Sequence, residues 1–356
     1  MESVDWDALI ADIKGQNAVL LLGHGFLPGA QKGLMGKLQE KLGARLLHTY
    51  ERDGLFLFAD PGAKVDAQRE ASQHYDSCTP PEGLLRKVVE IPFPLIISAN
   101  PDQTLFNTFK KYRLPIQFDY FSSNYKSGDY SIEKPTANNP LLYNLCGSLE
   151  DRESMILDFD DLFMMLKDLL SDQKVPLSVK TRIQKTTTYI FIGFHFERWY
   201  TQLFMRYLNR HDNHFSNSSS NYVLNTKFTN KDDEEFFLEQ FKVKYIGADT
   251  KFFEEVYKRF KEKYPDQLRK LTDFLSPDAT KVVQLVEKAD FPSAFQMMKK
   301  LFPQLDADDQ TLLSITESEF SQYRILMQEG TSTQENLNIM LNRVKKNLIE
   351  LAKKLA

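Results

Sequence analysis

Four short segments place polar residues and glycines directly after an apolar run. The first, Gly-His-Gly-Phe-Leu-Pro-Gly at residues 23–29, follows the run 18–22 and precedes a helical pattern from Gln31. Glycines between a strand and a helix let a phosphate approach backbone N–H groups at the helix N-terminus. The last glycine falls one residue late for Gly-x-Gly-x-x-Gly, so a plain strand-to-helix turn with His24 pointing outward explains the segment equally well.

The second segment, Ser98-Ala99-Asn100-Pro101-Asp102-Gln103, ends the apolar run that begins at Leu95. In open α/β sheets ligands bind at the carboxyl ends of strands, which is where this segment lies. The same residues also form a good helix start without a ligand, because Asn100 suits the N-cap, Pro101 the first helical position and Gln103 the third. Capping and ligand contact are compatible, and both stay open.

The third and fourth segments each place a glycine after a buried strand. They are Leu-Leu-Tyr-Asn-Leu-Cys-Gly-Ser-Leu at residues 141–149 and Ile-Phe-Ile-Gly-Phe-His-Phe-Glu-Arg-Trp at residues 190–199. Downstream of the third, Asp158 and Asp160 each fit a helix cap better than a catalytic acid. In the fourth, Trp199 fits the core better than a stacking platform.

Hydrophobic periodicity predicts the elements that position these segments. Short apolar runs alternate with helical patterns from residue 18 to about 260, which is typical of parallel strands joined by crossover helices. We therefore expect an α/β fold with a Rossmann-like, mostly parallel sheet flanked by helices. The predicted strands are 18–22, 95–98, 141–146, 189–192, 221–224 and 242–246, with 55–58 weaker. The predicted helices are 31–42, 102–111, 160–170, 199–210, 232–241 and 250–263.

A second domain is expected after the sheet. Pro277 cannot continue the preceding helix and Ser276 can cap the next, so we place the boundary between domains 1–275 and 276–356. The serine-rich run 211–220 is instead predicted to be a solvated loop within the first domain. A small all-α bundle is predicted for the tail, with helices near 278–289, 293–302, 308–329 and 334–355.

The last predicted helix carries a heptad stripe of apolar residues. Such a stripe packs either inside the tail's own bundle or against another chain, and the first arrangement is the simpler one. The stripe consists of Leu337, Leu341, Val344, Leu348, Leu351 and Leu355.

Composition excludes several classes of protein. The 356 residues carry 42% hydrophobic and 26% charged side chains, which supports a folded core. A formal net charge of -4 argues against direct nucleic-acid binding, and the two cysteines, Cys78 and Cys146, form no metal-binding pair. Apolar runs are too short to span a membrane and no secretory signal is visible, so we expect a cytoplasmic protein with no metal and no membrane contact.

The order of the four segments resembles the sirtuin-like family over about residues 15–260. More narrowly, it looks like the bacterial sirtuin-like domains that hydrolyse NAD in antiviral defence. The resemblance implies a Rossmann-type pocket with NAD as substrate or ligand. The implied binding residues are Gly23, His24, Gly25, Ser98, Asn100, Asp102, Cys146, Gly147, Gly193 and Phe194.

The family pattern also implies where these residues meet the dinucleotide. Gly23 and Gly25 would approach the pyrophosphate, Asn100 and Asp102 would lie beside the nicotinamide ribose, and Gly193 would line the adenine side. Asn100 and Asp102 are the expected catalytic residues. The first would orient the ribose and a water, and the second would stabilise positive charge that develops on the sugar.

The sequence departs from the family at two places. His24, Phe26 and Leu27 stand where the glycine loop normally has small residues and would crowd the phosphates. Cys146 stands at the position of the family's catalytic histidine, with Asn144 two residues earlier. Since deacylases use that histidine as a general base, and the family's zinc-binding cysteines are absent from the sequence, protein deacylation is not expected. Cys146 itself is a poor base and fits a small buried apolar position.

Three functions remain open. The first is an NAD-consuming effector that releases nicotinamide and ADP-ribose when assembled. The second is a catalytically inactive nucleotide-binding sensor or scaffold, and the third is a Rossmann-type protein for another nucleotide. Residues 280–355 also resemble small effector-associated domains, which implies a homo-oligomer or a partner adaptor or sensor protein bound through the tail.

Overall fold

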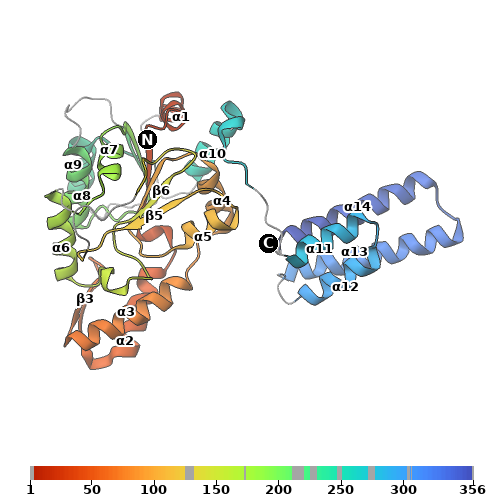
Figure 1. Cartoon of the computed structure of the whole chain (residues 1–356), viewed down its shortest axis with the longest axis horizontal. Coiled ribbons are helices and arrows are strands. Elements are labelled where there is room, and N and C mark those ends of the chain that lie inside the picture. Colours follow the sequence, from red (N-terminus) through yellow and green to blue (C-terminus); the bar gives the residue numbers. More distant parts are fainter. Residues whose placement is uncertain are drawn as a thin grey trace. The chain divides into compact units, whose positions relative to one another are not determined.

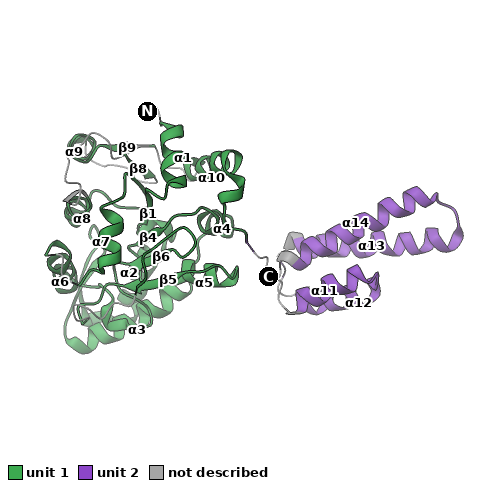
Figure 2. Cartoon of the chain, turned by 45° about the horizontal axis from the view of Figure 1, so that its top comes forward, with its two compact units in different colours: residues 1–270 green, residues 271–356 purple. Residues whose placement is uncertain are grey.

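The chain forms two compact units, residues 1–270 and 271–356 (Figure 2). The boundary predicted between residues 275 and 276, and all but the last residue of the run 211–220, lie outside the described part of the chain. The structure is a computed structural model that describes residues 4–124, 132–171, 174–210, 220–224, 231–246, 251–271, 277–302, 305 and 307–354.

Unit 1 is built on a seven-stranded sheet in the order β5-β6-β4-β1-β7-β8-β9, and every neighbouring pair is parallel. The α/β prediction is thus confirmed. Central strands such as β1 are apolar throughout because helices bury both faces of a parallel sheet. The strands are β1 (Ala18–Leu22), β4 (Leu95–Ser98), β5 (Gln117–Tyr120), β6 (Leu141–Asn144), β7 (Thr188–Ile192), β8 (Ser220–Leu224) and β9 (Val243–Tyr245).

Helices cover the sheet on opposite sides, with α6 to α9 on the left of Figure 1 and α4, α5 and α10 on the right. One core cluster joins α6 to α9 to the face of the sheet that carries Val19, Leu21 and Phe191. The helices of unit 1 are α1 (Trp6–Lys14), α2 (Ala30–Leu42), α3 (Pro61–Asp76), α4 (Glu82–Glu90), α5 (Thr104–Lys111), α6 (Phe159–Leu170), α7 (Leu177–Ile183), α8 (Trp199–Arg210), α9 (Lys231–Phe241) and α10 (Lys251–Lys263).

The strand order creates a switch point at β1. The chain proceeds from β1 to β4, β5 and β6 on one side and then crosses to β7, β8 and β9 on the other. Ligands of open α/β sheets bind at the carboxyl ends of the strands beside such a point. Here those ends belong to β1, β4, β6 and β7, which are the strands that precede the four segments.

An antiparallel hairpin and two helices, which lie between β1 and β4 in the sequence, form a small layer of their own. The hairpin consists of β2 (Leu46–Tyr50) and β3 (Leu55–Phe58), and α2 packs against α3 in a second core cluster. Because α3 contributes mainly Ala63, Ala67 and Ala71 to this core, its apolar stripe is weak, and the sequence did not predict the helix. This layer brings the turn between β2 and β3 to the candidate site.

Unit 2 is an all-α bundle, as predicted. Its helices are α11 (Pro277–Glu287), α12 (Phe291–Leu301), α13 (Ala307–Glu329) and α14 (Gln334–Lys354). The heptad stripe of α14 packs inside the bundle, where Val344, Leu348 and Leu351 are fully buried against α11 and α12 residues. Leu355 lies outside the described residues. In the described part of the chain, no helix combines the length and apolar character needed to cross a membrane.

Candidate functional site

A cavity of about 70 Å³ opens at the carboxyl edge of the sheet, and we call it the strand-edge cavity. Helices α2, α3, α6 and α8 complete its wall. A volume of this size accommodates a few water molecules, so a dinucleotide enters only if wall side chains move. The strand ends contribute Gly23, His24, Ala99, Leu145, Cys146, Phe194, His195 and Arg198, and the hairpin turn contributes Asp53 to Phe56.

His24 and Asn100 form a hydrogen-bonded pair, of which His24 lines the cavity and Asn100 does not. Asn100 is 1% exposed, and its Nδ2 donates to the carbonyl oxygen of Gly23 at 3.0 Å. The amide oxygen therefore faces the Nδ1 atom of His24, 3.1 Å away. Since an amide oxygen only accepts, this network assigns the imidazole proton to Nδ1 and leaves a lone pair on Nε2.

The surroundings keep the His24 ring neutral. Burial in the cavity wall lowers the pKa of His24 to about 3, and the nearby charges of Arg198 and His195 act in the same direction. His24 lines the strand-edge cavity, and its contact with a ligand stays a prediction. At physiological pH this side chain offers the cavity a hydrogen-bond acceptor and no charge.

The glycines of the first loop are required by contact with β7. The N–H of Gly23 donates to Ile192 at 2.7 Å, and that of Gly25 donates to Gly193 at 2.8 Å. A Cβ on Gly23 would lie 2.3 Å from the carbonyl oxygen of Gly193, which itself has φ +71. Backbone packing thus explains these glycines without a phosphate, and the two N–H groups already have acceptors.

Asp102 faces a different cavity from the one that His24 borders. It lines a pocket of about 590 Å³ beside α5, together with Gln103, Thr104 and Tyr75. Burial raises the pKa of Asp102, whose carboxylate accepts the N–H of Thr104 at 2.9 Å. Tyr75 lines both pockets, so its side chain is part of the wall that they share.

The predicted helix start at Asn100 is wrong. Helix α5 begins at Thr104 with Gln103 in the cap position. Asn100 cannot act as the cap because its amide is engaged by Gly23 and His24 across the sheet edge.

Each of the remaining predicted residues either borders the strand-edge cavity or stabilises a loop or turn beside it. Phe194 and Cys146 border the strand-edge cavity, and burial raises the pKa of the Cys146 thiol to about 12. Cys146 therefore stays protonated and cannot replace the family histidine as a base. Ser98 supports the loop by accepting the N–H of Asn100 at 3.1 Å. Gly147, at φ +85, forms a tight turn whose Cβ would lie 2.3 Å from the Ser154 carbonyl oxygen.

Arg198 is a polar residue of the cavity wall that the sequence did not predict. Arg198 is 3% exposed and donates to the Tyr200 hydroxyl at 2.8 Å and to Gln31 Oε1 at 2.5 Å. Tyr200 in turn donates to the backbone oxygen of Asp53 at 2.9 Å. The sequence carried one signal of this buried arginine. Arg198 lies between the aromatic residues Phe196 and Trp199, where an apolar strand is predicted to meet the next helix.

Among the residues that the structure describes, no group of three or more histidine, cysteine or acidic side chains is arranged to hold a metal ion. The strand-edge cavity is lined by an arginine, a neutral histidine, a second histidine and an aspartate, and by the amide or hydroxyl groups of Gln31, Tyr75, Tyr200 and Thr201. Such a set suits a ligand that carries both anionic groups and hydroxyls.

Comparison with known families finds the two kinds of domain that the resemblance implied. Residues 94–246 match the model of the SIR2-like domain, and residues 277–356 match that of Effector-associated domain 11. The first match includes Asn100, Cys146 and Arg198 but not the glycine loop. None of the curated proteins matches the chain. SIR2-like domains bind NAD, and effector-associated domains suggest protein partners. The chain therefore joins a SIR2-like domain to a C-terminal effector-associated domain, an organisation that suggests a defence-type effector.

Proposed function

We propose that unit 1 binds NAD and hydrolyses its nicotinamide–ribose bond in bacterial antiviral defence. Water adds to the anomeric carbon of the ribose, the carbon–nitrogen bond breaks, and neutral nicotinamide leaves. The other products are ADP-ribose and one proton. The observation that carries the proposal is the His24–Asn100 pair at the switch point of a SIR2-like sheet.

The pair supplies what such a reaction needs most. Its transition state is oxocarbenium-like, so orientation of the water and the sugar contributes much of the rate. The unprotonated Nε2 of His24 accepts a hydrogen bond from the water or from a ribose hydroxyl. Asn100 acts through His24 as a positioning residue, because its amide keeps the proton on Nδ1. The role proposed for Asp102 requires a ribose that reaches past Tyr75.

The test is nicotinamide release from NAD by the full chain over a range of protein concentrations. Asn100→Ala is expected to reduce release by roughly 100-fold or more, because the orientation of His24 is lost. The loss of two buried hydrogen bonds should also cost about 1–3 kcal/mol of stability.

A matched control separates catalysis from folding. Asn221→Ala removes an equally buried asparagine from β8, where Nδ2 donates to the Phe241 carbonyl oxygen. This variant should lose stability without losing release. Full activity in Asn100→Ala, or equal losses in both variants, would contradict the proposed role of Asn100.

A second function is favoured by the position of Cys146. Its thiol stands where the family has a catalytic histidine and stays protonated, which suits an inactive nucleotide-binding sensor or scaffold. Tight NAD binding without nicotinamide release at every protein concentration, including the assembled state, would support this alternative.

The C-terminal unit is proposed to bring copies of the chain, or an adaptor protein, together. Large apolar side chains are exposed on its two long helices, although the bundle has a complete core of its own. Exposed apolar groups that the bundle does not need are suited to contact with another protein. They are Ile315, Ile325 and Met327 on α13 and Ile339 on α14.

A further inference from the structure

Arg198 lines the strand-edge cavity, and no ion pair is formed by it among the described residues. Its guanidinium has two neutral partners, Tyr200 and Gln31, and its Nε is buried without any partner. Within the described part of the chain, no carboxylate lies within ion-pair distance of it. Burying an uncompensated charge is costly, so a folded protein normally retains one only where something else supplies the opposite charge.

No neighbouring carboxylate of the described residues forms a direct ion pair with this charge. Against the effect of burial, the hydrogen bond with His195 at 3.1 Å lowers the pKa of Glu197, and the more distant charge of Arg198 lowers it further, while His24 is neutral. The centre of the guanidinium lies 5.9 Å from the Tyr200 ring, which gives a weak cation–π contact. Asp53 lines the same cavity, but it forms no ion pair with Arg198 and its Oδ1 is also buried without a partner.

Two separate unsatisfied groups of opposite sign restrict the ligand. The guanidinium requires an anion with acceptor oxygens, and the Asp53 carboxylate requires a hydrogen-bond donor. A phosphate joined to a sugar supplies both. We propose that Arg198 binds a phosphate oxygen of the dinucleotide's pyrophosphate from the β7–α8 joint. The phosphate is then held by the side chain of Arg198 and not by the N–H groups of Gly23 and Gly25, which are already bonded.

This inference deepens the proposed function and can be tested without measuring hydrolysis. Calorimetry on the full chain would compare inorganic pyrophosphate, ADP-ribose and adenosine, for the original chain and for Arg198→Gln. We expect Arg198→Gln to weaken pyrophosphate and ADP-ribose about 10- to 100-fold, in line with the loss of a charge-assisted hydrogen bond. Adenosine, which has no phosphate, should bind equally to both.

Arg52→Gln is the control, because the Arg52 guanidinium donates to the backbone oxygen of Glu197 from an exposed position and does not line the cavity. Unchanged ADP-ribose affinity in Arg198→Gln, or an equal loss for ADP-ribose and adenosine, would overturn the proposal. If Arg198→Gln does not fold, competition in the original chain decides, since pyrophosphate that fails to displace ADP-ribose also overturns it.

The outcomes also separate this inference from the hydrolase. If the chain binds ADP-ribose through Arg198 but releases no nicotinamide, the proposed phosphate site is supported. The proposed hydrolysis is then contradicted. If pyrophosphate binds through Arg198 but ADP-ribose does not bind, Arg198 forms an anion site. The proposal that this site binds a dinucleotide is then overturned. If Arg198→Gln still releases nicotinamide and binds ADP-ribose with full affinity, the proposed hydrolase stands. The proposed phosphate site at Arg198 is then overturned.

Discussion

His24 is held in one protonation state by a neighbour that is distant in sequence. The Asn100 amide can present only its oxygen, because its nitrogen is used by Gly23. Burial disfavours the charged ring, so the side chain acts as a neutral acceptor in the cavity wall. Cys146, which borders the same cavity, has no comparable chemistry, since burial raises the pKa of its thiol.

The depressed pKa of His24 predicts a pH dependence of stability. The unfolded chain takes up a proton near the ordinary pKa of 6.5, whereas the folded chain does so only near 3. Stability from this group is therefore complete above about pH 6.5 and is lost as the pH falls towards 3. The slope contributed by His24 approaches about 1.4 kcal/mol per pH unit in that window.

His24→Asn keeps a donor for Asn100 and removes the titration. Its free energy of unfolding, measured by urea denaturation from pH 7 to 4, should fall less steeply than that of the original chain. His48→Asn, at an exposed position on β2, should behave like the original chain. Parallel curves for His24→Asn and the original chain would show that the ring is protonated in the folded state.

At the scale of elements, the loops after the strands depend on the strand beside them. The loop after β1 contacts the end of β7, and the N–H of Leu145 after β6 donates to Ser98 on β4 at 2.7 Å. Helix α6 begins with a capping box in which Asp158 and Asp161 satisfy each other's N–H groups. The predicted cap at Asp158 is thereby confirmed.

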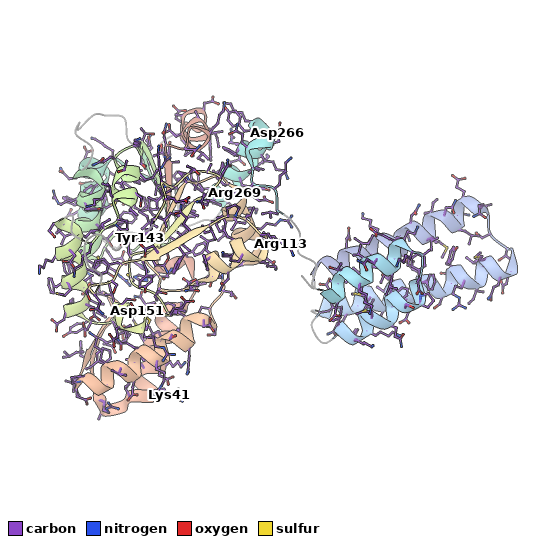
Figure 3. All side chains as sticks on the ribbon, viewed as in Figure 1. Lys41, Arg113, Tyr143, Asp151, Asp266 and Arg269 are labelled. Atoms are coloured by element: carbon purple, nitrogen blue, oxygen red, sulfur yellow. The ribbon has the colours of Figure 1, made fainter. Side chains whose placement is uncertain are left out.

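Arg269 joins the last described segment of unit 1 to the residues just before β4, at the end of the sheet where that strand begins. Its guanidinium donates to the carbonyl oxygens of Val89, Ile91 and Phe93, at the end of α4 and the entrance to β4, and to that of Ala137. Figure 3 labels this residue near α4. Arg269→Ala leaves these carbonyls unsatisfied and should lower the free energy of unfolding by about 2–5 kcal/mol.

Chemical denaturation of the full chain would measure this loss. Lys270→Ala, at the exposed neighbouring position, is the control and should change stability by less than about 0.5 kcal/mol. An Arg269→Ala chain as stable as this control would show that water replaces the guanidinium at no cost.

At the scale of the whole molecule, the two units have separate cores. One set of clusters lies around the sheet and its α2–α3 layer, and another lies within the four helices of the tail. An independent core is the main requirement for a domain that folds alone. This organisation allows the proposed hydrolysis and the proposed partner binding to reside in different parts of one chain.

A chain that ends at residue 271 tests this separation. It keeps Arg269 and should unfold cooperatively, bind ADP-ribose like the full chain and fail to assemble at any concentration. Residues 277–356 alone should remain helical and show a melting transition by circular dichroism. Aggregation of the shortened chain would indicate that the tail completes the core of unit 1.

The sequence by itself determined the α/β class, the central parallel strands and the helical tail. Strands buried on both faces must be apolar along their whole length, and the bundle requires an apolar stripe, so both leave a local pattern. Elements without such a pattern were missed. β5 is half-buried throughout, and the α3 core is made of alanines.

Only the tertiary structure decided the chemistry of the site. The order of the strands places Gly193 against the first loop, Asn100 against His24 and Asp102 in a separate pocket. The lone guanidinium of Arg198 becomes visible in the same way. These relations depend on which strand ends lie side by side, and long-range packing sets that order, whereas local periodicity records only which face of each element is buried.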